Sequence, residues 1–123
     1  MKPRSAVAAA FVLTLASASA VAAPGAAAQR EIDGLMQALA ESNCRFQRNG
    51  RWYDAGDARH HLQRKYDYLL RRDLADTAEL FIERAASRSS ISGKPYRVSC
   101  PGHAEQDAAS WFQQQLARLR GHR

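Results

Sequence analysis

Cysteine is scarce in this sequence: Cys44 and Cys100 are the only two in 123 residues. Neither lies near the start of the chain, so the cysteine that would carry a lipid anchor after export is absent. The start also lacks a pair of adjacent arginines, which marks the signals that export folded proteins. These absences argue against a lipoprotein and predict that an exported chain would cross the membrane unfolded.

Sequence motifs of common catalytic sites are missing as well. There is no G-x-S-x-G turn, and S-x-x-K fails because Ile91 stands three residues before Lys94. The carboxylates are scattered, so no pair can be placed in the geometry of a glycosidase. The sequence therefore carries no direct sign of an enzyme.

The start of the chain has the parts of a cleavable signal peptide. Lys2 and Arg4 supply positive charge, residues 5–23 are uncharged, and Ala20-Val21-Ala22 offers the small residues that signal peptidase requires. The uncharged run is mostly alanine and serine, so it is less hydrophobic than a stable membrane span. We expect cleavage after Ala22, with a cut after Ala28 as the alternative.

Cleavage would leave one domain in an oxidising compartment. We expect residues 1–23 to be the signal peptide, residues 24–28 a disordered leader and residues 29–121 a single domain. The alanine-rich signal peptide is typical of bacteria, so the predicted location is the periplasm. There Cys44 and Cys100 are expected to form one disulfide, which would stabilise the fold by roughly 4 kcal/mol.

The chain is basic, with a formal net charge of +6 that falls to about +4 once Lys2 and Arg4 are removed. A basic domain can bind nucleic acid, but export argues against that partner. The charge is then either a solvated surface that serves solubility or an attraction to an anionic component of the cell envelope.

Four segments carry apolar residues at the spacing of an amphipathic helix. The first helix is expected over residues 29–42, the second from Asp54 or Asp57 to Arg72, and the last over residues 107–120. Asp76 is expected to cap the third helix, with Glu79 completing a capping box. The apolar stripes are Ile32, Leu35, Met36 and Leu39; Ala58, Leu62, Tyr66, Leu69 and Leu70; Ala78, Phe81, Ile82 and Ala85; and Trp111, Phe112, Leu116 and Leu119.

Two other segments have the character of strands. Asn49-Gly50 is a strong hairpin signal because both residues tolerate the positive φ of a type I′ turn, so residues 44–53 are predicted to form a hairpin. Residues 95–100 are predicted to add a third strand after a loop at 87–93. The expected fold is α+β: a small antiparallel sheet, made of the hairpin and one strand, packed against about four helices and joined by one disulfide.

His61 and Lys65 are the first candidates for a functional site. They are four residues apart on the second helix, so they share one face beside its buried stripe. A basic neighbour lowers the pKa of a histidine and favours the neutral imidazole, which can act as a base. The alternative is that both residues line the edge of the core, where the lysine stem covers apolar surface.

The serine-rich loop that ends at Lys94 is the second candidate. Ser89, Ser90 and Ser92 offer hydroxyls, Gly93 gives access to backbone amides, and Lys94 supplies a cation. Such a loop could bind an anion. Ordinary turn chemistry is the alternative explanation of the serines and the glycine.

A metal site is the third candidate. Cys100 and His103 have a C-x-x-H spacing, and Cys44 with His60 or His61 could complete four zinc ligands. Zinc sites show more tightly paired ligands, and an oxidising compartment favours the disulfide. We therefore predict neither a metal nor another cofactor.

Several short motifs follow one another in a distinctive order: Phe46-x-Arg48-Asn49-Gly50, Ala58-x-x-His61-Leu62-x-x-Lys65, Asp76-Thr77-Ala78-Glu79-x-Phe81-Ile82, Ala86-Ser87-x-Ser89-Ser90-Ile91-x-Gly93-Lys94-Pro95-Tyr96-x-Val98 and Pro101-Gly102. In this order, over about residues 32–116, the chain resembles the YfeK-like family, small secreted bacterial proteins of unknown function. The resemblance implies a single periplasmic domain with no assigned activity.

The polar positions shared with this family are hard to explain by packing, so we expect them to converge on one surface. Our first hypothesis is a non-catalytic binding module whose partner is an envelope protein or an anionic envelope component, and which spans no membrane after cleavage. One alternative is a small hydrolase that uses His61 with a serine of the loop that ends at Lys94; another is a purely structural role. The candidate binding residues are Arg48, Asn49, His61, Lys65, Ser90, Ser92, Lys94 and Tyr96.

Overall fold

The computed structural model describes residues 3, 5, 8–14 and 25–121, and its folded part begins at Gly25. The predicted cleavage motif Ala20-Val21-Ala22 lies outside the described residues. Within the described ranges, no helix is both long and apolar enough to cross a membrane.

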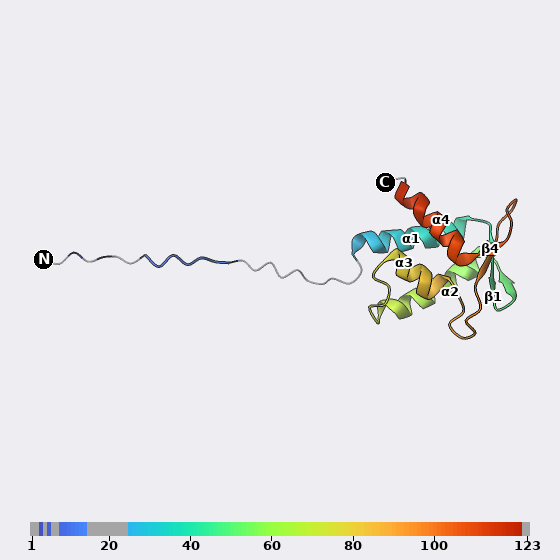
Figure 1. Ribbon diagram of the computed structural model, residues 1–123, viewed down its shortest axis with the longest axis horizontal. Coiled ribbons are helices and arrows are strands. Elements are labelled where there is room, and N and C mark those ends of the chain that lie inside the picture. Colours follow the sequence, from blue (N-terminus) through green and yellow to red (C-terminus); the bar gives the residue numbers. More distant parts are fainter. Residues whose placement is uncertain (1–2, 4, 6–7, 15–24, 122–123) are drawn as a thin grey trace.

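The elements of the fold follow in the order α-β-β-α-α-β-β-α, with a π-helical turn after the third helix (Figure 1). They are α1 (Ala26–Glu41), β1 (Arg45–Arg48), β2 (Arg51–Tyr53), α2 (Ala55–Leu70), α3 (Ala78–Phe81), the π-helix η1 (Ile82–Ala86), β3 (Arg97–Ser99), β4 (Gln106–Asp107) and α4 (Ala108–Gly121). The predicted α+β class is confirmed.

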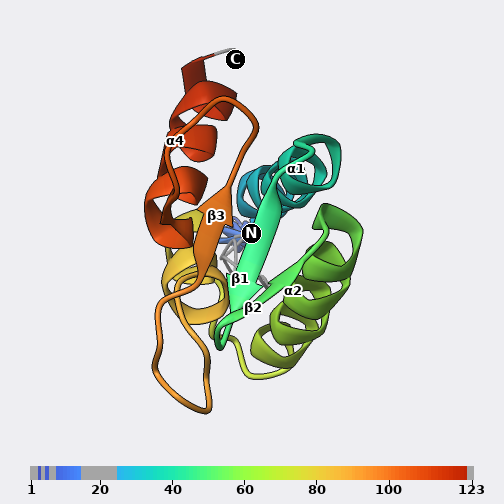
Figure 2. The same ribbon diagram turned by 90° about the vertical axis from the view of Figure 1, so that its right-hand side faces the viewer.

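The sheet is antiparallel throughout, with strand order β2-β1-β3-β4. Figure 2 shows β1 and β3 in the middle of the molecule, with α4 on one side of them and α1 and α2 on the other. The predicted hairpin is confirmed, because Asn49 (φ 52°) and Gly50 (φ 78°) form the turn and both have positive φ. Strand β4 was not predicted, since two residues are too few to show an alternating pattern.

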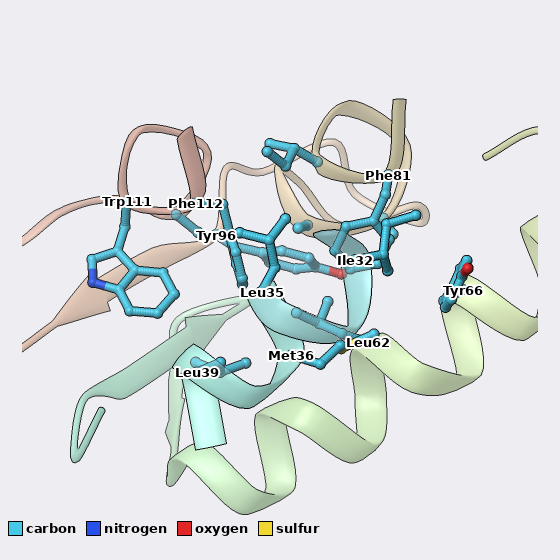
Figure 3. Packing of buried hydrophobic residues seen from close by; sticks show 14 of the residues in the cluster. Ile32, Leu35, Met36, Leu39, Leu62, Tyr66, Phe81, Tyr96, Trp111 and Phe112 are labelled. Carbon is cyan, nitrogen blue, oxygen red and sulfur yellow. The ribbon is translucent and has the colours of Figure 1, made fainter. Parts of the chain in front are cut away.

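The core lies where the helices meet the inner face of the sheet. The α1 stripe of Ile32, Leu35, Met36 and Leu39 is at most 1% exposed, as its helical spacing predicts (Figure 3). Side chains from all the remaining helices, from the two central strands and from the residue before β3 surround that stripe. They include Phe46, Leu62, Tyr66, Phe81, Tyr96, Val98, Trp111 and Phe112.

Two expected helix starts are wrong. Helix α1 begins at Ala26, so residues 26–28 are helical and do not belong to a disordered leader. Alanine has the highest helix propensity, which lets the helix extend to these residues. The third helix is capped by Thr77, whose hydroxyl accepts a hydrogen bond from the Leu80 amide, and not by Asp76.

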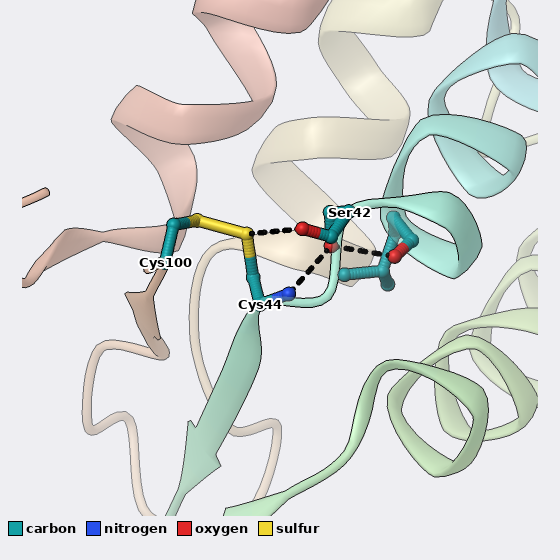
Figure 4. The surroundings of a disulfide bond; sticks show 4 residues. Ser42, Cys44 and Cys100 are labelled. Atoms are coloured by element: carbon teal, nitrogen blue, oxygen red, sulfur yellow. Dashed lines mark hydrogen bonds between the residues drawn. A yellow bond between two sulfur atoms is a disulfide. The ribbon is translucent and has the colours of Figure 1, made fainter. Parts of the chain in front are cut away.

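The predicted disulfide is confirmed and joins Cys44 to Cys100, with 4.2 Å between the two Cα atoms (Figure 4). Cys44 precedes β1 and Cys100 follows β3, one position beyond the Arg45–Ser99 pair of the ladder. Ser42 joins this end of β1 to α1, because its hydroxyl donates to the Leu39 carbonyl and accepts from the Cys44 amide.

Candidate functional site

Five polar side chains meet at the end of β1 that is opposite the disulfide. Arg48, Tyr53, His61, Lys65 and Tyr96 come from β1, β2, α2 and the residue before β3. We refer to these five residues as the Arg48–Lys65 cluster. The structure therefore brings together four of the candidate binding residues and adds Tyr53.

The strand and helix periods explain why the cluster forms. Arg48 lies two residues after Phe46, so the two side chains share one face of β1. Phe46 is buried in the core, whereas Arg48 lies at the end of the strand and is half-buried. His61 and Lys65 lie on successive turns of α2, on the face next to the Leu62 stripe.

Tyr96 is the buried floor of the cluster. The residue is 1% exposed, and its ring packs against Phe46 with 4.9 Å between ring centroids. Its hydroxyl lies 3.1 Å from His61 Nε2 and accepts a hydrogen bond of 3.1 Å from Lys65 Nζ. Lys65 Nζ also donates to the Arg88 carbonyl at 3.0 Å.

Arg48 contacts the imidazole from the side of the hairpin. Its Nη1 lies 2.5 Å from His61 Nδ1, and its Nη2 donates to the Tyr53 hydroxyl at 3.2 Å. A guanidinium can only donate, so the imidazole nitrogen that it contacts must accept. His61 is therefore held in its neutral form.

The electrostatic environment agrees with that geometry. Burial, followed by the charges of Arg48, Lys65 and Arg64, lowers the pKa of His61 to about 4. Burial and then Arg48 lower the pKa of Lys65 to about 8. Burial also raises the pKa of the Tyr96 hydroxyl, so Tyr96 stays protonated at neutral pH.

Among the described residues, no acidic side chain forms an ion pair with Arg48 or Lys65. The ion pairs of the described residues join Arg97 to Glu105 and Asp107, and Arg120 to Glu31 and Glu79. Arg48 and Lys65 take part in none of them. Two like charges therefore lie together, half-buried, with no acidic side chain of the described residues within ion-pair distance.

Three hollows open beside the cluster. The smallest, of about 190 Å³, is lined by Arg48, Tyr53 and His61 together with the acidic Asp57. No acidic residue lines either of the two larger hollows. Of these two, one is about 410 Å³ and lies between the hairpin and the loop of residues 89–94, which we refer to as the serine loop. The other is about 460 Å³ and lies along α2. Arg48, His61, Lys65 and Ser90 line both. Further cations line one or the other: Arg51 in the first, and Arg64 and Arg84 in the second.

The serine loop is built mainly by contacts within itself and with the hairpin turn. The Ser89 hydroxyl accepts from the amides of Ile91 and Ser92, both at 3.2 Å. Asn49 donates to that hydroxyl at 3.4 Å and accepts from the Ser92 hydroxyl at 2.5 Å. Asn49 and Ser92, both candidate binding residues, are thus tied to each other and hold the loop against the hairpin.

Lys94 is not brought into the cluster. Its backbone amide donates to the Ser92 hydroxyl and its carbonyl accepts from the Ser89 amide, whereas its side chain is exposed and lines none of these hollows. Arg51, Tyr53, Arg64 and Arg84 were missed. Arg51 could have been found, because it is the residue opposite Arg48 in any two-residue hairpin around Asn49-Gly50.

The pairings that the hydrolase and metal interpretations require do not form in the described part of the chain. His61 contacts Arg48 and Tyr96, and no serine hydroxyl lies within hydrogen-bond distance of it. Both cysteine sulfurs are used in the disulfide. The described residues also hold no group of three or more histidine, cysteine or acidic side chains suited to a metal ion.

Comparison with known proteins gives a family without a known activity. Residues 26–120 match a family model described as "Family of unknown function (DUF5329)". The "Uncharacterized protein YfeK" of Salmonella typhimurium is 41% identical over 69 residues, which cover 55% of this chain and 56% of that protein. The chain thus spans about half the length of this curated relative, and no solved structure matches. The family match covers more than half of the chain and confirms the resemblance drawn from the motifs, so this protein belongs to the DUF5329 family.

Proposed function

We propose that this protein is an exported, non-catalytic binding module that holds an anionic ligand at the Arg48–Lys65 cluster. The observation that carries the proposal is the unbalanced charge: Arg48 and Lys65 lie together, half-buried, without an acidic partner in the described chain. Placing like charges together is unfavourable. A bound anion would supply the missing negative charge.

The donors of the cluster suit a phosphate or a carboxylate. A guanidinium offers a planar fork that matches such oxygens, and an ammonium adds a compact point charge. Ser90, which lines both of the larger hollows, can add a hydroxyl. Neutral His61 lies between the two cations and fixes the guanidinium through its ring nitrogen.

The location belongs to the same proposal. Residues 1–23 would direct the chain out of the cytoplasm, and the disulfide is consistent with an oxidising compartment. The exported protein would then be one domain in the periplasm that spans no membrane, with α1 as its first element. Its ligand would be an anionic component of the envelope, and nucleic acid is excluded by that location.

Titration with inorganic phosphate at low ionic strength, followed by amide NMR shifts, tests the function. We expect saturable shifts around Arg48, Lys65 and Ser90, and a dissociation constant that rises above about pH 8 as Lys65 loses its proton. Arg48→Gln or Lys65→Gln should weaken binding about tenfold or more, the loss of one charge-assisted hydrogen bond.

The matched control is Arg118→Gln, which removes an exposed arginine that lines none of the hollows beside the cluster. It should leave the dissociation constant unchanged. Non-saturable shifts in the wild type, or equal losses in the control and in Arg48→Gln, would contradict the proposed function.

A further inference from the structure

The loop beside the cluster exposes an apolar side chain almost completely. Ile91 is 96% exposed, whereas the other exposed large hydrophobic residues of the segment 25–121, Tyr68 and Leu74, are 49% and 37% exposed. Figure 2 shows the loop between η1 and β3 projecting beyond the β1–β2 turn at the bottom of the view. Ile91 thus belongs to a loop that projects from the fold and exposes its side chain.

The loop holds Ile91 in that position through its own hydrogen bonds. The Ile91 amide donates to the Ser89 hydroxyl at 3.2 Å, and the Gly93 amide donates to the Ser89 carbonyl at 3.0 Å. Gly93 has a φ of +73°, which suits the tight return of the chain. Because Asn49 ties Ser92 to the hairpin turn, the loop is anchored on a second element as well.

Cations lie beside Ile91 on the side of the loop that faces the Arg48–Lys65 cluster. Ile91 lines the 410 Å³ hollow together with Arg48, Arg51 and Lys65, and no acidic residue lines that hollow. Arg88 and Lys94 flank the loop in the chain and are exposed. The acidic residues Glu79, Glu83 and Asp107 line a different hollow, which the loop borders on its other side through Arg88 and Gly93.

We propose that this end of the molecule docks on a membrane surface that contains anionic phospholipid, with a headgroup phosphate bound by Arg48 and Lys65 and with Ile91 inserted among the lipids. The inference rests on the proposed function and names the carrier of the anion. A free phosphate or an acidic peptide would satisfy the cations but would leave Ile91 in water. A lipid surface complements both, because anionic headgroups attract basic side chains and the layer beneath them is apolar.

Sedimentation with lipid vesicles tests the inference, using the protein purified after export. We expect binding to vesicles of phosphatidylcholine with phosphatidylglycerol and weak or no binding to phosphatidylcholine alone. Ile91→Ser should weaken vesicle binding about tenfold, since it removes apolar contact with the lipid. The same variant should still bind inorganic phosphate saturably, because it removes none of the cations of the cluster.

Leu74→Ser is the matched control, because Leu74 is an exposed aliphatic residue that lines none of the hollows beside the cluster. It should bind vesicles as the wild type does. If Ile91→Ser and the wild type bind vesicles equally, or if the wild type binds phosphate or polyglutamate but no vesicles, the lipid inference is overturned and the anion site stands. If the wild type does not bind phosphate saturably, the proposed function itself fails.

Discussion

At the scale of single residues, His61 lies in surroundings that change how its imidazole titrates. Its imidazole is half-buried between Arg48, Lys65 and Arg64, and these surroundings lower its pKa to about 4 from an ordinary value of 6.5. Between these two pH values the unfolded chain binds a proton at this position and the folded chain does not. The folded state is therefore disfavoured as the pH falls through this window.

We expect the free energy of unfolding to fall as the pH is lowered from about 6.5 to about 4, and His61→Asn to remove part of that fall. Urea denaturation at a series of pH values measures the slope. The neighbouring variant His60→Asn, which changes an exposed histidine, is the control and should keep the wild-type slope. An unchanged slope in His61→Asn would show that the imidazole does not carry the effect.

At the scale of the elements, the N-terminus of the short helix α3 differs from the capping box of Asp76 and Glu79 that the sequence predicts. Thr77 provides the cap, with its hydroxyl accepting from the Leu80 amide at 3.1 Å. Glu79 is thereby one position nearer the helix start than a capping box needs. It forms an ion pair with Arg120 of α4, so the same short helix is also tied to the last one.

Thr77→Ala should lower the free energy of unfolding by about 1 kcal/mol, the usual effect of removing a capping hydroxyl. Asp76→Ala should lower it by less, because the Asp76 side chain does not cap the helix. Urea or thermal denaturation of the two variants side by side makes the comparison. If both variants lose the same free energy of unfolding, or if Asp76→Ala loses more, then Thr77 is not the residue that caps the helix.

The elements that repeat a pattern could be predicted from the sequence. The α1 stripe from Ile32 to Leu39 has helical spacing, and Asn49-Gly50 supports only a narrow choice of turns. The π-helix Ile82–Ala86 and the two-residue strand β4 could not be predicted, because both depend on tertiary contacts. Strand β4, for example, pairs with β3 where Arg97 reaches Asp107.

The candidate site was predictable to a similar degree. His61 and Lys65 share a helix face whatever the tertiary fold, so their proximity follows from spacing alone. Their meeting with Arg48 and Tyr96 depends on the antiparallel pairing of β1 with β3, which local sequence does not specify. Lys94 was predicted to belong to the site because it ends the serine loop. In the structure its backbone makes hydrogen bonds within that loop, and its side chain lines neither of the larger hollows.

At the scale of the whole molecule, one disulfide and one ion pair join segments that are distant in the sequence. The disulfide links residues 56 positions apart. The ion pair between Glu31 of α1 and Arg120 of α4 joins the first helix to the last. Both ties lie away from the Arg48–Lys65 cluster, which is at the other end of β1 from Cys44.

Replacing both cysteines by serine should lower the free energy of unfolding by roughly 4 kcal/mol, the chain-entropy value for a loop of this length. Urea denaturation of the double variant, beside wild-type protein with and without dithiothreitol, measures the loss. Reduced wild type should match the double variant. A loss below about 1 kcal/mol would mean that the disulfide does not restrict the unfolded chain as that value assumes.

The position of the disulfide also bears on how the chain reaches its native strand alignment. Cys44 and Cys100 face each other one position beyond the Arg45–Ser99 pair, so the bond between them favours the native register of β1 and β3. A slip of one residue would turn Phe46 out of the core and carry Arg48 to the opposite face of the sheet. Oxidation would thus favour, during folding, the strand alignment in which the Arg48–Lys65 cluster is assembled.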